Sequence, residues 1–411
     1  MTRASMGLLV AAAVVMAATG AMRAAVPIAQ GRTSSPTAVA PHVVESPGQP
    51  PDAAFKDDVH ARAGLTCASC HGGPKPGGGY ATIARTAIAP LCAKCHADAA
   101  YMKTFAPQVR VDQYAQYQTS VHGRQMAKGE TRVATCSDCH RAHGIVAVRD
   151  TRSPVAPTHV AQTCGRCHGD PARMTPFNRS PDIPGDWSKS VHADALLKRG
   201  DTSAPTCSTC HGSHGATPPG AESVANVCAQ CHVREAELFK KSRKAELFRS
   251  MGQGDCLTCH SNHHIEPPQA SWIGLDEKAL CATCHDDTMP GAAAITTVRA
   301  GFDDLQGRMA AAREVLGRAE TAGMLVEDGK LALHNAGEAH VRLRVLVHTF
   351  AAAPFDDVLK EGVAAANEAR TVGTSAMSEL QYRRRGLAVA TLVILGFLGT
   401  LLVKIRRLPA T

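Results

Sequence analysis

Cysteine spacing constrains this chain more than any other feature. All sixteen cysteines fall in eight C-x-x-C pairs, and a histidine follows the second cysteine of every pair. No cysteine is left for a disulfide framework. The spacing also argues against structural zinc, whose sites join one such pair to another or to a distant histidine pair. C-x-x-C-H is the pattern of c-type haem attachment, so the sequence predicts eight covalent haems.

The two thiols of each motif are expected to bond the two vinyl groups of one porphyrin, and the histidine to ligate its iron. The predicted attachment residues are Cys67, Cys70, Cys92, Cys95, Cys136, Cys139, Cys164, Cys167, Cys207, Cys210, Cys228, Cys231, Cys256, Cys259, Cys281 and Cys284. The predicted proximal ligands are His71, His96, His140, His168, His211, His232, His260 and His285.

Other histidines supply candidates for the sixth iron position. Three lie upstream of a motif pair, two of them in the strings SVHG and SVHA: His60, His122 and His192. Three follow a motif in the pattern C-x-x-C-H-x-x-H: His143, His214 and His263. His159 and His264 complete the predicted set, and adjacent His263 and His264 can serve two haems. Because the candidates recur with the repeats, we expect nearly complete bis-histidine ligation.

The remaining candidates are weaker. We expect His42 to be unligated, and His334 and His340 to lie on helix surfaces or in packing contacts. The same is expected of His348, although its apolar string VLVHTF leaves contact with a neighbouring haem as an alternative. Met251 stands where the fourth unit lacks an upstream histidine; core packing is expected of it, with ligation of an iron as the alternative.

The motifs come in pairs. Two-haem units begin at Cys67, Cys136 and Cys207 at nearly equal spacing, and a shorter step leads to a fourth unit at Cys256. Roughly 27 residues are available for each haem, too few for a conventional core around each cofactor. We therefore expect a fold that is mostly irregular, with short α-helices wrapped around packed haems.

Composition divides the N-terminal part of the chain. A basic start, an apolar run and small residues predict a secretory signal peptide over 1–25. A stretch rich in Pro, Ser and Ala predicts a flexible linker over 26–59. The octahaem domain of four two-haem units is predicted over 60–290.

The C-terminal part has no cysteine and is predicted to be helical. Apolar residues from Ile295 to Ala319 step by three and four, and a second helix is expected to end at Pro354. This predicts an all-α helical hairpin or coiled region over 291–382, with a third helix beginning near Phe355.

An uncharged apolar run follows and predicts a transmembrane helix over 386–403. Haem is attached on the exported side of the membrane, so the tail 404–411 is expected in the cytoplasm. The expected location is a bacterial inner membrane with a single C-terminal anchor and the haem domain in the periplasm.

The formal charge of +8 by itself suggests binding to nucleic acid or an anionic membrane. Two propionates on each ferric haem outweigh the surplus charge of its iron porphyrin, so eight haems cancel about eight positive charges. We therefore expect no nucleic-acid partner.

The strings SVHG, CSDCHRAH and CGRCH, and then SVHA, CSTCHGSH and CAQCH, carry a family resemblance. Over about residues 60 to 290 the chain resembles the multihaem cytochrome c family with doubled C-x-x-C-H motifs. That family is related to small tetrahaem low-potential cytochromes and to periplasmic decahaem cytochromes of bacterial extracellular respiration. The resemblance implies a loop and short-helix fold around closely packed bis-histidine haems that conduct electrons.

These observations predict an electron carrier without catalytic residues. Its expected redox partners are a membrane quinol-oxidising or dehydrogenase donor and a periplasmic or outer-membrane acceptor, in an anaerobic-type respiration. The heptad pattern of the helical region also allows a homo-oligomer. The alternative is a multihaem oxidoreductase of the nitrite, hydroxylamine or tetrathionate type with one open iron. A filament subunit is disfavoured by the membrane anchor.

Overall fold

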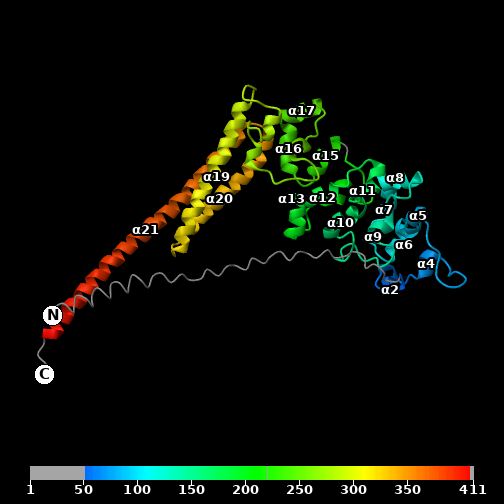
Figure 1. Cartoon of the computed structure of the whole chain (residues 1–411), viewed down its shortest axis with the longest axis horizontal. Coiled ribbons are helices and arrows are strands. Elements are labelled where there is room, and N and C mark those ends of the chain that lie inside the picture. The colour runs from blue at the N-terminus through cyan, green and yellow to red at the C-terminus, as the bar shows by residue number, and fades with distance from the viewer. Residues whose placement is uncertain (1–50, 220, 408–411) are drawn as a thin grey trace. The chain divides into compact units, whose positions relative to one another are not determined.

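A computed structural model of the chain describes residues 51–219 and 221–407. The predicted signal peptide, most of the predicted linker with His42, and the end of the predicted tail lie outside the described residues. Within the described ranges the chain forms helices and no strand (Figure 1).

Between Pro51 and Thr283 the helices are short and joined by loops. They are α2 (Pro51–Phe55), α3 (Val59–Arg62), α4 (Cys67–His71), α5 (Arg85–His96), α6 (Ala99–Lys103), α7 (Gln113–Thr119), α8 (Val121–Ala127), α9 (Cys136–His140), α10 (Pro157–His168), α11 (Pro171–Met174), η2 (Thr175–Phe177), α12 (Ile183–Ser188), α13 (Val191–Ala193), η3 (Asp194–Lys198), α14 (Cys207–His211), α15 (Ala221–Cys228), α16 (Val233–Lys241), α17 (Arg243–Ser250), α18 (Leu257–His260), η4 (Ala270–Trp272) and η5 (Leu280–Thr283).

The first motif of units one to three forms a helix of its own. In each case a threonine precedes the first cysteine, and its backbone N–H donates to the side chain three residues later. These bonds run from Thr66 to Ser69 (3.0 Å), from Thr135 to Asp138 (2.7 Å) and from Thr206 to Thr209 (3.1 Å). They stabilise the first turn, which places both thiols and the histidine within little more than one helical turn.

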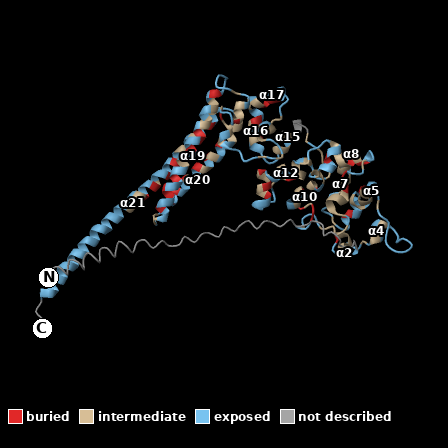
Figure 2. Ribbon diagram, viewed as in Figure 1, coloured by how far each residue is buried: buried red, intermediate tan, exposed pale blue. Residues whose placement is uncertain are grey.

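Apolar clusters in this part of the chain are small. One contains Trp187, Ala193 and Leu196, and another contains Phe239, Ala245 and Phe248. Most other side chains here are half-buried or exposed (Figure 2). The protein atoms alone therefore provide little conventional core between Pro51 and Thr283, as expected if cofactors fill the interior.

Three long helices follow: α19 (Ala292–Thr321), α20 (Glu327–Leu346) and α21 (Ala352–Arg407), which lie side by side over much of their length (Figure 1). We call α19, α20 and the part of α21 that packs on them the helical bundle. Its core includes Phe302, Leu305, Leu343 and Phe355, each no more than 2% exposed. Such burial stabilises a helix by about 1.5–3 kcal/mol for each large apolar side chain.

Glycines allow α21 to approach both partners closely. A Cβ atom on Gly362 would lie 2.9 Å from the Cβ of Ala339, and one on Gly373 would lie 2.7 Å from Cγ1 of Val315. Neither position has room for a side chain, so larger residues there would force the helices apart.

The connection between α20 and α21 differs from the prediction. α20 ends at Leu346, the short helix η6 (Val347–Thr349) follows, and Phe350 adopts a left-handed conformation with φ of 51°. The expectation that Pro354 ends the second helix is therefore wrong. Pro354 lies in the first turn of α21, where the missing N–H would have no helical partner.

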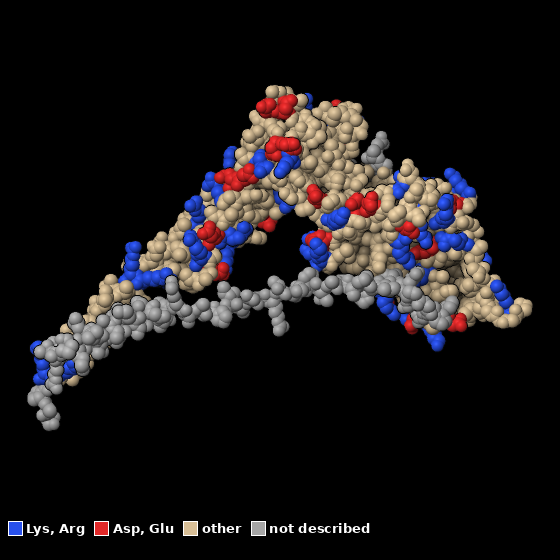
Figure 3. All heavy atoms as spheres, in the orientation of Figure 1, with Lys and Arg blue, Asp and Glu red and all other residues tan. Residues whose placement is uncertain are grey.

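α21 continues without interruption into the apolar run that begins at Gly386. Among the described residues it is the one helix long and apolar enough to cross a membrane; its most apolar 18-residue window has a mean hydropathy of 2.4 and no buried residue. Arginines at 383–385 precede the run and basic residues at 404, 406 and 407 follow it. Figure 3 shows the uncharged surface along this end of the helix. It has the properties of a membrane anchor.

Deleting residues 386–411 is expected to release haem-loaded protein from the membrane into the soluble fraction, because the deletion removes this apolar run. Fractionation and detection of covalent haem in each fraction measure the effect. A chain that lacks only 404–411 is the control and should stay in the membrane. Retention of the longer deletion through a high-salt wash would contradict the prediction.

Candidate haem sites

Seven of the eight motif histidines face a second histidine across a gap. The ring centres of each pair lie 6.0 to 6.4 Å apart. The pairs are His71 with His143, His96 with His60, His140 with His214, His168 with His122, His211 with His263, His232 with His192, and His260 with His348.

This separation fits a metal ion between the two rings. Metal–imidazole bonds measure about 2.0–2.1 Å, and a ring centre lies about 1.1 Å beyond its nitrogen, so two rings on one metal have centres about 6.2–6.4 Å apart. Each pair also includes a C-x-x-C-H histidine with its two thiols nearby. The residues therefore fit haem iron with two axial histidines, held by two thioether bonds.

Two pair geometries alternate along the chain. The pairs of the first motif in each unit have nearly parallel rings, with interplanar angles of 10° to 20°. The pairs of the second motif in units one to three have crossed rings, with angles of 84°, 52° and 46°. The two-haem repeat seen in the sequence is thus also a repeat in ligand geometry.

The source of the facing histidine follows one rule. The second motif of a unit is paired with the histidine upstream of that same unit, as His168 is with His122. The first motif of a unit is paired with a histidine from the following unit, as His71 is with His143. Consecutive units therefore interlock through their ligands.

The rule explains an unexpected position for His348. The first motif of unit four has no following unit, and its His260 instead faces His348 of η6, with ring centres 6.1 Å apart. This placement does not agree with the expected packing role of His348 and fits the alternative, contact with a neighbouring haem. The short helix η6, which follows α20, provides the histidine opposite His260.

Several paired rings are oriented by their other nitrogen. Nδ1 of His71 lies 2.7 Å from the carbonyl oxygen of Ala81, and Nδ1 of His348 lies 2.9 Å from that of Val345. Nδ1 of His60 lies 2.9 Å from Oδ1 of Asp58. An Nδ1–H that donates to such an oxygen leaves Nε2 free for a metal and fixes the plane of the ring.

Burial keeps many of these rings in the form that binds metal. Desolvation lowers the pKa of His96, His122, His140, His168, His192, His214, His260 and His263. Burial disfavours the charged imidazolium, so these side chains are neutral near pH 7. The neutral imidazole is the ligand of metal ions.

The motifs are adjacent in space in the order in which they occur in the chain. In three cases a thiol of one motif raises the pKa of a thiol of the neighbouring motif: Cys136 that of Cys92, Cys207 that of Cys164, and Cys228 that of Cys256. Within each unit, burial raises the pKa of a thiol of one motif, and a nearby thiol of the other motif adds to the rise: Cys70 beside Cys95, Cys139 beside Cys167, Cys210 beside Cys228, and Cys259 beside Cys281. Each attachment site thus lies next to the one that follows it in sequence.

The eighth motif has a different neighbour. Nε2 of His285 lies 2.7 Å from Nζ of Lys244, and no imidazole among the described residues faces it as in the other seven sites. Nδ1 of His285 is buried without a hydrogen-bond partner. Sequence reasoning did not identify Lys244.

Two predicted ligands are not placed opposite a motif histidine. Nδ1 of His159 lies 2.9 Å from the carbonyl oxygen of Ser153 on the neighbouring turn. His264 is exposed, so the idea that it and His263 serve two haems does not agree with the structure, where only His263 faces a motif histidine. Met251 is 56% exposed, which agrees with neither ligation nor the expected core packing.

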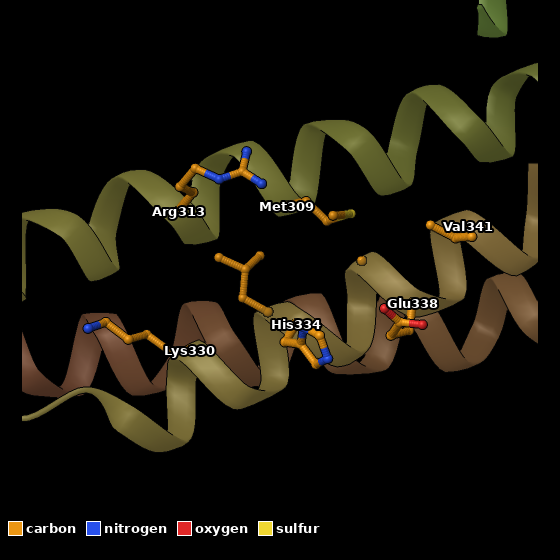
Figure 4. Close-up of a pocket in the computed structure, with 8 residues that line it drawn as sticks. Met309, Arg313, Lys330, His334, Glu338 and Val341 are labelled. Atoms are coloured by element: carbon orange, nitrogen blue, oxygen red, sulfur yellow. The ribbon is translucent and has the colours of Figure 1, made fainter. Parts of the chain in front are cut away.

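His334 and His340 lie in the helical bundle. His334 lines a groove between α19 and α20, where Met309 and Arg313 lie across from Glu338 and Val341 (Figure 4). The ring of His340 contacts that of Phe302 edge-on, with centres 5.7 Å apart. No cysteine lines the groove, which is therefore separate from the haem sites.

One family profile matches much of the haem region. The family profile described as cytochrome c3 matches residues 59–169 and 201–286, two segments that contain all sixteen motif cysteines. No curated protein and no solved structure matches the chain significantly. The family match supports a multihaem c-type cytochrome with covalently bound haem c, and members of this family are generally electron carriers.

Proposed function

We propose that this protein is a membrane-anchored octahaem c-type cytochrome that relays electrons through a periplasmic haem domain. The observation that carries the proposal is the set of seven facing histidine pairs, because two axial histidines leave no iron position open for a substrate. Haem supplies the one-electron chemistry when bound. The chain supplies the axial ligands, the attachment thiols and the spacing between sites.

The order of the sites supports conduction along the chain. Each motif lies next to its neighbours in sequence, so electrons can pass from the first site to the eighth by short steps. The expected direction joins a quinol-linked or dehydrogenase donor in the membrane to a periplasmic or outer-membrane acceptor.

The length of α21 indicates what kind of electron donor can reach the seventh and eighth haem sites. His348 and Phe350 precede the first residue of this helix, and the apolar run begins at Gly386. At 1.5 Å per residue, the intervening helix is about 51 Å long. A quinol inside the bilayer is therefore too far from the seventh and eighth sites for direct transfer along an upright helix. This favours a protein donor that projects from the membrane.

The eighth site favours one alternative function. Because His285 faces no imidazole among residues 51–219 and 221–407, its iron is the candidate for an open position in an oxidoreductase that acts on nitrite, hydroxylamine or tetrathionate. Low-temperature EPR of the oxidised full chain separates the two functions. The relay predicts eight low-spin haems, in parallel-ligand and crossed-ligand classes, and little binding of cyanide or carbon monoxide. A stoichiometric high-spin haem that turns over nitrite or hydroxylamine would overturn the proposal.

A further inference from the structure

We propose that Lys244 is the sixth ligand of the eighth haem, which would then be coordinated by His285 and a lysine amine. The inference rests on the proposed function only in assuming that the C-x-x-C-H motifs carry haem c. It gives the exceptional eighth site a ligand of a different chemical class from those of the other seven.

Lys244 occupies the same helix position as the upstream histidines of units one to three. His60, His122 and His192 are each the second residue of a helix, α3, α8 and α13. Lys244 is the second residue of α17. Each of those three histidines faces the histidine of the second motif in its own unit, and Lys244 faces His285, which belongs to the second motif of unit four.

The segments that lead into these helices also match. Each ligand position is the sixth residue of one of four matching strings: FKDDVH, YQTSVH, WSKSVH and FKKSRK. The first residue of each string is aromatic, and the fourth is the N-cap residue of the helix. The N-cap backbone N–H donates to the carbonyl of the aromatic residue in all four. These bonds are Asp58 to Phe55 (3.1 Å), Ser120 to Tyr117 (3.0 Å), Ser190 to Trp187 (2.9 Å) and Ser242 to Phe239 (2.9 Å).

The hydroxyl groups of the N-cap serines repeat the match. Oγ of Ser120 donates to the carbonyl of Tyr117 at 2.6 Å, and Oγ of Ser242 donates to that of Phe239 at 2.7 Å. The same turn therefore delivers a side chain to the haem position in every unit. In unit four the delivered side chain is a lysine.

The geometry at His285 allows an iron to be inserted. Nζ of Lys244 lies 2.7 Å from Nε2 of His285, whereas two nitrogens on opposite sides of one metal are separated by about 4.0–4.2 Å. A lysine has a flexible four-carbon stem that can withdraw by the difference. Nζ also lies over the ring of Phe350, 5.9 Å from its centre.

Spectroscopy of the full-length, haem-loaded protein tests the proposal. Near-infrared magnetic circular dichroism distinguishes histidine–amine from bis-histidine ligation, and low-temperature EPR counts the high-spin haems. We expect seven bis-histidine haems and one histidine–amine haem. Lys244→Ala should convert that one haem to a high-spin form that binds carbon monoxide, and Lys244→His should return it to low spin with a bis-histidine signature. Lys240→Ala, an exposed change on α16, is the matched control and should leave all eight haems unchanged.

The outcomes separate this inference from the proposed function. Eight bis-histidine signals, or an unchanged low-spin count in Lys244→Ala, would overturn lysine ligation and leave the relay intact. An unmutated protein with one high-spin haem would also overturn lysine ligation, and only substrate turnover at that haem would overturn the relay as well. If Lys244→Ala fails to accumulate, Lys244→His still tests lysine ligation. The histidine–amine signature should be present in the unmutated protein and absent from Lys244→His only if Lys244 is the ligand.

Discussion

Replacing His348 with alanine is expected to convert one of the eight low-spin haems into a high-spin haem that binds carbon monoxide. The imidazole of His348 faces that of His260 at a distance that fits a shared iron, so the substitution removes one axial ligand. The porphyrin remains attached through Cys256 and Cys259, and His260 remains its proximal ligand. Haem content should therefore stay at eight while the low-spin EPR intensity falls by about one eighth.

His340→Ala is the matched control for this substitution. His340 also lies in the helical bundle, but its ring contacts Phe302 and its Nε2 lies 3.1 Å from Nε2 of Gln306. Its loss should leave every haem low-spin. If His348→Ala keeps the full low-spin intensity, the bundle does not provide a ligand and another residue completes the seventh site.

The sequence predicts most of the histidines that face a motif histidine, but not which motif histidine each one faces. The recurring strings SVH and C-x-x-C-H-x-x-H identify five of the seven histidines that face a motif histidine, and the position of His60 upstream of unit one identifies a sixth. They do not reveal which motif each one faces, because the downstream histidine of one unit crosses to the preceding unit. This pairing depends on how consecutive units pack together, and the spacing of residues along the chain does not predict that packing.

The sequence predictions do not include Lys244, and for His348 they favour a packing role, with contact to a neighbouring haem as the alternative suggested by the string VLVHTF. His348 lies in a helical region with no cysteine motif. The pairing of each first motif with a histidine of the next unit is what singles it out. Lys244 had a local signal, since FKKSRK shares its aromatic residue, serine and spacing with YQTSVH and WSKSVH. A search restricted to histidine cannot find that signal.

Helix existence was more predictable than helix ends. The apolar periodicity indicated the long helices of the bundle, because burial of one face dominates their stability. Pro354 was read as a helix end, although proline is equally compatible with a first turn. The left-handed conformation of Phe350 separates the two helices instead. A non-glycine residue rarely adopts this conformation, so the sequence gives no reason to expect a break at Phe350.

A chain made without haem is expected to lose the structure of its haem region, residues 60–290, while the helical bundle survives. In the part of the haem region that the structure describes, the apolar clusters are small, such as that of Trp187, Ala193 and Leu196, so protein contacts alone cannot offset the conformational entropy of this region. The bundle has its own core, in which Leu316, Ala319 and Ala369 are at most 3% exposed.

Limited proteolysis of the detergent-solubilised chain, produced with and without haem attachment, measures the difference. The haem-loaded chain should resist cleavage throughout the haem region, and its intact mass should exceed that of the polypeptide by eight haem masses. The haem-free chain should be cut throughout residues 60–290 and leave a resistant fragment close to Ala292–Arg407. Six or fewer haem masses after complete maturation would contradict the count. Equal protease resistance of the two chains would show that protein contacts, and not cofactors, hold the haem region together.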